Sequence, residues 1–121
     1  MLKKKLIVNG MPRNLVVDPE ASLAEVLRNQ LFLLGTKIGC GTAMCGACNV
    51  ILDGKLMRSC VVKMSAVPDE AQITTVEGIG QPGNLHPIQA ALVAHGAPQC
   101  GYCMSGMVVS AKAFLDENKN P

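Results

Sequence analysis

Three cysteines within nine residues constrain this chain more than any other feature of its sequence. Cys40, Cys45 and Cys48 lie in the stretch GCGTAMCGACNV, residues 39–50, and Cys60 follows after eleven further residues. Thiols grouped this tightly are seldom needed for packing, and in a chain without a secretion signal they are expected to be metal ligands rather than disulfides. The open questions are which metal centre they hold and which residue supplies its fourth ligand.

The spacing of these four cysteines, C-x4-C-x2-C followed by one distant cysteine, is that of the plant-type 2Fe–2S ferredoxins. A tight loop supplies three thiolates, and Cys60, at the end of a predicted hairpin strand, supplies the fourth. Gly39, Gly41 and Gly46 let the loop backbone adopt positive φ and bring its N–H groups close to the cluster sulfurs. The spacing therefore predicts one complete 2Fe–2S site.

A second C-x2-C motif, Cys100 and Cys103, stands near the end of the chain. By itself it fits half of a metal site, or a thioredoxin-like redox pair that lacks the usual βαβ context. A zinc site that joins this pair to Cys45 and Cys48 also remains open, although it would leave the other two cysteines without a role. Buried thiols without a metal are the remaining alternative.

Residues 1–76 have the pattern of a small mixed sheet. Asn9-Gly10 predicts a two-residue hairpin turn. Ser22 and Glu25 form a capping box for a helix that should end near Leu34-Gly35. Strands are expected at 4–8, 14–17, 49–52, 56–62 and 71–76. We therefore expect a sheet with one helix packed across it.

Residues 77–121 have a helical pattern instead. Four Gly and Pro residues between 78 and 83 indicate a linker. Helices are expected from Pro87, with His86 as a cap, to His95, and again over 105–118. The fold class is therefore α+β, with one domain at 1–76 and a second, incomplete one at 77–121.

Composition excludes several classes of function. The net charge is +2 and the chain holds only three aromatic residues, which argues against nucleic-acid binding. Its apolar runs are too short to span a membrane, and the N-terminus does not resemble a signal peptide, so a cytoplasmic protein is expected. The basic run Lys3–Lys5 is expected to be a solvated strand at the edge of the sheet.

The order of the motifs carries a family resemblance. GCGTAMCGAC, then Cys60, LHPIQ and QCGYCMSGM, resembles the iron–sulfur part of the molybdenum hydroxylases, which include xanthine dehydrogenases and aldehyde oxidoreductases. The stretch ITTVEGIGQPGNLHPIQ is most similar to the bacterial aldehyde oxidoreductases. The resemblance implies a β-grasp, plant-type ferredoxin-like domain, followed by a helical domain of the four-helix-bundle type that holds a second 2Fe–2S cluster.

The resemblance also implies roles for the second motif. Cys100 and Cys103 would provide two of the four ligands of the second cluster. In the family the other two come from a C-x-C motif about thirty residues further on, and this sequence has no such motif after Cys103. Gln99 would contact the molybdopterin cofactor, which a large partner subunit or domain holds.

Electron transfer is the function that the resemblance implies. The partner's molybdenum centre would oxidise an aldehyde or an N-heterocycle, and this chain would pass the electrons to an external acceptor or to an FAD subunit. The substrate site would then lie outside this chain. The alternative is a stand-alone 2Fe–2S or zinc-stabilised docking module, but a simple plant-type ferredoxin needs no second C-x2-C motif.

Overall fold

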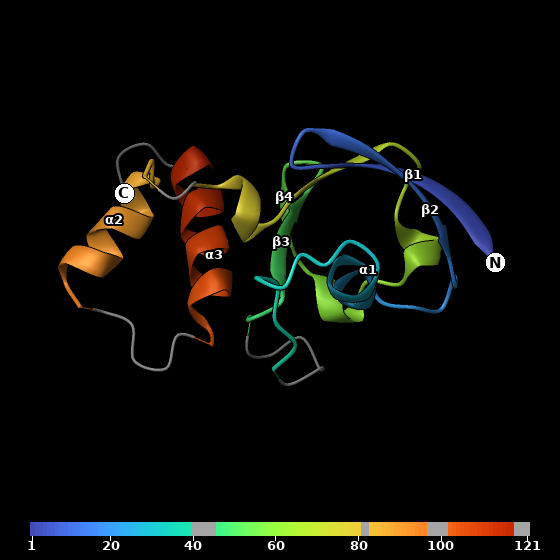
Figure 1. Ribbon diagram of the computed structural model, residues 1–121, viewed down its shortest axis with the longest axis horizontal. Helices are drawn as coiled ribbons and strands as arrows, with labels where there is room; N and C mark the ends of the chain where they lie inside the picture. Colours follow the sequence, from blue (N-terminus) through green and yellow to red (C-terminus); the bar gives the residue numbers. More distant parts are fainter. Residues whose placement is uncertain (40–45, 81–82, 97–101, 118–121) are drawn as a thin grey trace.

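The computed structural model describes residues 1–39, 46–80, 83–96 and 102–117. In chain order the strands and helices are β1 Leu2–Val8, β2 Met11–Val17, α1 Leu23–Asn29, β3 Asn49–Leu52, β4 Lys55–Arg58, β5 Ala71–Thr74, α2 Pro87–Ala94 and α3 Met104–Glu117. Figure 1 shows a curved sheet with one helix, α1, on its inner side and two further helices, α3 and then α2, on the other side of β3. Short 3-10 turns follow β4 and β5, namely η1 Ser59–Val61, η2 Met64–Ala66 and η3 Val76–Gly78.

The sheet has the order β2-β1-β5-β3-β4. β1 and β2 form an antiparallel hairpin, whereas β1 and β5 are parallel, and β3 is antiparallel to both of its neighbours. Asn9 and Gly10 have φ values of 52° and 81°. Two positive φ angles are what a type I′ hairpin turn requires. The predicted hairpin and the α+β fold class are both confirmed.

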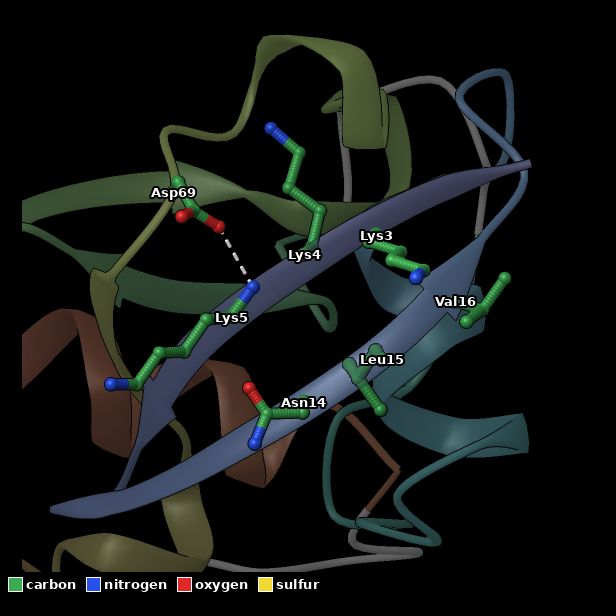
Figure 2. Close-up of a pocket in the computed structure, with 7 residues that line it drawn as sticks. All are labelled: Lys3, Lys4, Lys5, Asn14, Leu15, Val16 and Asp69. Carbon is green, nitrogen blue, oxygen red and sulfur yellow. Dashed lines mark hydrogen bonds between the residues drawn. The ribbon is translucent and has the colours of Figure 1, made fainter.

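The expectation for the basic run Lys3–Lys5 was wrong, because β1 lies inside the sheet and β2 and β4 are its edges. The Lys4 ammonium donates to the carbonyl of Val67, and the Lys5 N–H donates to the Asp69 carboxylate at 2.8 Å. Figure 2 shows these lysines along β1 beside β2, around an open pocket of about 400 Å³. Parallel pairing with β5, which the local sequence does not encode, places β1 inside the sheet.

Two apolar cores lie on opposite faces of β3. Val50 and Leu52 belong to the main core between the sheet and α1, whereas Ile51 packs against the second core of Ile79, Val108 and Val109. Alternate residues of a strand point to opposite faces, so one strand serves both cores. The main core consists of Leu6, Val8, Val17, Leu23, Val26, Leu27, Val50, Leu52, Met64, Val67, Ala71 and Ile73.

Helix α1 begins where the capping box predicts and ends earlier than expected. The Ser22 hydroxyl accepts the Glu25 N–H at 3.1 Å. The helix ends at Asn29 rather than near Leu34-Gly35, because Phe32 has a φ of 57° and the Leu33 N–H turns back to the Leu27 carbonyl. A residue in the left-handed conformation ends an α-helix. Glycine usually marks such a residue in a sequence, but here the position is occupied by Phe32.

The strand predicted at 56–62 is shorter than expected. It ends at Arg58, and residues 59–61 form η1. The segment after η1 is bonded to the start of α1 and to the residues before it, from Leu23 N–H to Val62 O and from Met64 N–H to Ala21 O. β5 likewise ends at Thr74 rather than at residue 76. Val76 and Ile79 pack in the second core, so this part of the chain is more ordered than the predicted linker.

The helical half agrees closely with the sequence. His86 caps α2 in a reciprocal capping box with Gln89, Pro87 occupies the first turn and Gly96 has a φ of 61°. α3 begins one residue before the predicted start and lies along β3 (Figure 1). Within the described ranges, no helix combines the length and apolar character that crossing a bilayer requires.

The joint between α3 and the sheet yields the first prediction. A Cβ at Gly106 would overlap the carbonyl oxygen of Gly46 and lie 2.9 Å from the Cα of Ala47. Gly106→Ala should therefore lower the free energy of unfolding by about 1–3 kcal/mol, as overpacking does. Urea denaturation, followed by circular dichroism, measures this change.

The sign of the change is decisive. Alanine favours a helix over glycine by about 1 kcal/mol, so without the close approach the same substitution would stabilise the protein. A Gly106→Ala chain more stable than the original would show that α3 does not contact the 46–47 backbone in solution.

Candidate iron–sulfur centre

The structure describes half of the predicted site residues. Cys48, Cys60, Cys103, Gly39 and Gly46 lie within the described ranges. The others lie outside the described residues, namely Cys40, Gly41, Cys45, Gln99 and Cys100. The complete ligand set therefore stays a prediction, and the described residues show how its parts are positioned.

Cys48 lies directly before β3 and is 1% exposed. Its carbonyl accepts two hydrogen bonds from Ser59, one from the backbone N–H at 3.3 Å and one from the hydroxyl at 2.5 Å. These bonds extend the β3–β4 ladder, in which Asn49 pairs with Arg58, by one further residue pair. The chain around Cys48 is thus held against the chain around Cys60, as a shared metal centre requires.

Cys60 occupies the middle of η1 and is half-buried. We expected it at the end of a strand, and this expectation was wrong, because β4 ends at Arg58. Ser59 is fully buried and its hydroxyl donates to the Cys48 carbonyl, and the chain turns into η1 directly after Arg58. Cys60 nevertheless lies one residue beyond the last paired position.

Gly46 ends the cysteine loop in a conformation that favours glycine. Its φ is +77°, and a Cβ there would lie 3.2 Å from the Arg58 guanidinium and 3.3 Å from the Asn49 amide nitrogen. Its carbonyl accepts the Asn49 N–H at 3.1 Å. The positive φ predicted for this loop is confirmed at Gly46, and Gly39 is exposed at the opposite end.

Cys103 is exposed in the turn that leads into α3. Its thiol lies 3.8 Å from the Met107 sulfur, and its carbonyl accepts the Met107 N–H at 3.1 Å. The neighbouring Tyr102 hydroxyl donates to the Ile38 carbonyl at 2.7 Å. Ile38 stands two residues before Cys40 in the sequence, so this bond ties the second cysteine motif to the start of the first.

Several residues where α3 meets the sheet were missed by the sequence analysis. The Asn49 side-chain Nδ2 donates to the Ser110 hydroxyl at 2.5 Å, and the Arg58 guanidinium donates to the Asn49 side-chain oxygen Oδ1. Asn49 and Arg58 follow and precede predicted ligands, so proximity to a cysteine was a usable signal. Ser110 is separated from Asn49 by 61 residues, and no local pattern marks it.

The described residues fit an iron–sulfur centre. Thiolates are soft ligands that select iron–sulfur clusters, zinc or copper(I). Hard cations such as Mg²⁺ and Ca²⁺ prefer oxygen ligands, so a set of cysteines does not suit them. Gly46, which follows Cys45 in the sequence, has the positive φ that a tight loop around a cluster uses. Among residues 1–39, 46–80, 83–96 and 102–117, no three potential metal ligands come together, because half of the cysteines lie in the remaining segments.

Two family models cover almost the whole chain. The model of the 2Fe–2S iron–sulfur cluster binding domain matches residues 6–76, and the model of a second 2Fe–2S binding domain matches residues 75–121. The two matches correspond to the β-sheet part of the chain and to its helical part.

Curated relatives are similar to this chain over nearly all of its length. Aldehyde oxidoreductase of Megalodesulfovibrio gigas is 59% identical over 121 residues, which are all of this chain and 13% of that protein. One nicotinate dehydrogenase subunit of Pseudomonas putida is 47% identical over 116 residues, which are 96% of this chain and 73% of that relative. The chain thus spans a small part of the first relative and about three quarters of the second.

Solved structures show the same fold. The aldehyde oxidoreductase from Desulfovibrio desulfuricans superposes on 100% of this chain with a TM-score of 0.98 and 58% identity, and this chain covers 13% of it. Quinoline 2-oxidoreductase from Pseudomonas putida superposes on 99% of this chain, with a TM-score of 0.93, 39% identity and 74% of that chain covered. The chain therefore belongs to the 2Fe–2S iron–sulfur family of the molybdenum hydroxylases.

Proposed function

We propose that this chain carries electrons as the iron–sulfur component of a molybdenum-dependent oxidoreductase. Its first 2Fe–2S centre would be held by Cys40, Cys45, Cys48 and Cys60. The observation that carries the proposal is the pair of hydrogen bonds from Ser59 to the Cys48 carbonyl, which holds the segment of Cys48 against the segment that precedes Cys60.

The chain's own residues would hold the centre and keep water from it. Ala47 and Cys48 are 2% and 1% exposed, and Val50 and Ser59 are fully buried. When bound, a 2Fe–2S cluster accepts and releases one electron at a time, at a potential set by net charge, hydrogen bonds and solvent exposure. The buried residues at the base of the loop would limit the solvent exposure of the cluster. The β3–β4 hairpin would limit reorganisation of the protein around it.

A second centre is proposed in the helical part. Cys100 and Cys103 would supply two of its ligands, and the other two would come from a C-x-C motif outside this sequence. The family match over residues 75–121 supports this, as does the hydrogen bond from Tyr102, the residue before Cys103, to Ile38, two residues before Cys40. We accordingly propose domains at 1–76 and 77–121.

The partner would be a large molybdopterin-binding subunit or domain, with Gln99 of this chain in contact with the cofactor. The oxidised substrate would be an aldehyde or an N-heterocycle, because the relatives are an aldehyde oxidoreductase, a nicotinate dehydrogenase and a quinoline oxidoreductase. An external acceptor or an FAD subunit would take the electrons. Thiolate ligands persist in a reducing compartment, which supports a cytoplasmic location.

A pair of matched substitutions tests the ligand assignment. In anaerobically purified chain, Cys48→Ser should remove most of the visible absorption and the iron, because a 2Fe–2S cluster needs all four thiolates. Cys103→Ser should leave the first centre intact. Iron and sulfide analysis, with EPR after dithionite reduction, measures both.

The same experiment separates the alternatives. Iron retained by Cys48→Ser at the level of the original chain would contradict the first site. A colourless chain that contains zinc in place of iron would favour the zinc-stabilised docking module.

Ser59 provides a test of the structural support for that site. Ser59→Ala removes the buried hydroxyl that donates to the Cys48 carbonyl, and this should cost about 1 kcal/mol of unfolding free energy. It should also speed the loss of the visible spectrum in the presence of an iron chelator. Ser65→Ala, at an exposed position in η2, is the control. Equal rates of cluster loss in the two variants would show that the bond does not hold the site together.

A further inference from the structure

Strand β2 forms one edge of the sheet. Among the described strands, β1 alone pairs with it. In an antiparallel pair, opposite residues alternate between those that bond to each other and those whose N–H and C=O groups point away from the partner strand. An edge strand therefore presents the backbone groups of every second residue, and another chain can pair with them.

The hydrogen bonds of Lys5 show which residues of β2 these are. The Lys5 N–H donates to the Asp69 carboxylate at 2.8 Å, and the Lys5 carbonyl accepts the Glu70 N–H at 2.6 Å. Both backbone groups of Lys5 thus point away from β2. Because Asn14 lies opposite Lys5, the N–H and C=O of Asn14 point outward at the edge. The alternation gives Val16 the same orientation.

A pocket lies beside these outward-pointing groups. It has a volume of about 400 Å³ and is lined by Lys3, Lys4, Lys5, Asn14, Leu15, Val16 and Asp69 (Figure 2). Val16 is 52% exposed and adds an apolar surface. Pro12 occupies the preceding outward position and has no N–H to donate, which confines full pairing to the second half of β2. Open backbone groups and a side-chain pocket therefore occur together.

The hairpin around this pocket is positively charged. Strands β1 and β2 contain three lysines and one arginine, and no carboxylate. Asp69 and Glu70 approach from the segment before β5, where Glu70 lies 3.5 Å from the Lys5 ammonium. Lys3 and Arg13 form no ion pair with any described residue. A segment that complements this edge in charge is therefore acidic.

We propose that the β2 edge binds an extended, acidic segment of a partner protein, which adds to the five-stranded sheet beside β2. Asn14 and Val16 would supply the backbone hydrogen bonds, and Lys3 the charge that selects an acidic segment. When a peptide adds to an open sheet edge, backbone bonds provide affinity and side-chain pockets provide specificity. This binding site goes beyond electron transfer and does not depend on the iron–sulfur centre.

Protection of the edge is the competing explanation, because charged side chains and proline also discourage the pairing of sheet edges. Asp18, directly after β2, brings a negative charge near the end of the strand, and its carboxylate accepts the Glu20 N–H at 2.9 Å. The two explanations differ in what the edge binds. A protected edge binds no extended segment, whereas the proposed site binds an acidic segment and not a basic one.

The experiment measures the binding of fluorescein-labelled peptides to the full chain by fluorescence anisotropy. The probe is a peptide of alternating glutamate and valine with blocked termini. One control peptide has lysine in place of glutamate, and a second carries a methyl group on each backbone nitrogen. We expect only the unmodified acidic peptide to bind, more weakly as salt is added, and to slow hydrogen exchange at the Asn14 and Val16 N–H groups.

Matched substitutions separate the charge from the backbone pairing. Lys3→Glu should weaken binding about tenfold, whereas Lys55→Glu makes the same change of charge at the opposite edge of the sheet and should have little effect. Asn14→Pro removes an outward N–H and should weaken binding about fivefold. Its control is Asn14→Ala, which keeps that N–H. Because Lys3 is exposed, Lys3→Glu remains a test even if Asn14→Pro fails to fold.

The opposite results would overturn the proposal. Failure of the acidic peptide to bind, or equal binding of the lysine peptide, would favour a protected edge. Equal binding of the N-methylated peptide would refute strand addition. Equal weakening by Lys3→Glu and Lys55→Glu would show that the peptide responds to net charge and not to the β2 edge. None of these results would change the iron–sulfur assignment.

Discussion

The carbonyl of Cys48 accepts both the N–H and the hydroxyl of Ser59, and the candidate centre depends on this contact. Eleven residues separate Cys48 from Cys60, so only a hairpin can return the chain to the cysteine loop. Because Ser59 and Cys48 are both buried, water does not compete for these bonds. The hairpin ladder therefore continues past its last regular pair and delivers Cys60 beside the loop.

The joint between the sheet and α3 couples this centre to the helical half. Ile51 faces the second core while its neighbours on β3 face the main core, so β3 belongs to both. Gly106 allows α3 to touch the backbone at Gly46, and Tyr102 bonds to Ile38. These contacts join α3 and the turn before it to the segments that carry Ile38 and Gly46.

Local rules predicted the elements whose signals are local. The Asn9-Gly10 turn, the Ser22 cap of α1 and the His86 cap of α2 follow from interactions between residues two to four positions apart. The end of α1 was misplaced because Phe32 adopts a left-handed conformation that glycine would normally signal. The position of Cys60 in η1 was missed because the strand ends at Arg58, and the contacts that fix this end are made with Cys48, eleven residues earlier than Ser59 in the chain.

The sequence by itself determined the α+β class, the order of the helices and strands, the family and the cysteines available as ligands. These follow from hydrophobic periodicity, capping residues and the spacing of thiols, all of which act over short distances along the chain. Only the tertiary structure decided that β1 lies inside the sheet, that α3 packs on β3, and that Arg58, Asn49 and Ser110 meet beside the cysteine loop. Asn49 and Ser110 are 61 residues apart, and no local pattern specifies which distant groups will satisfy each other's hydrogen bonds.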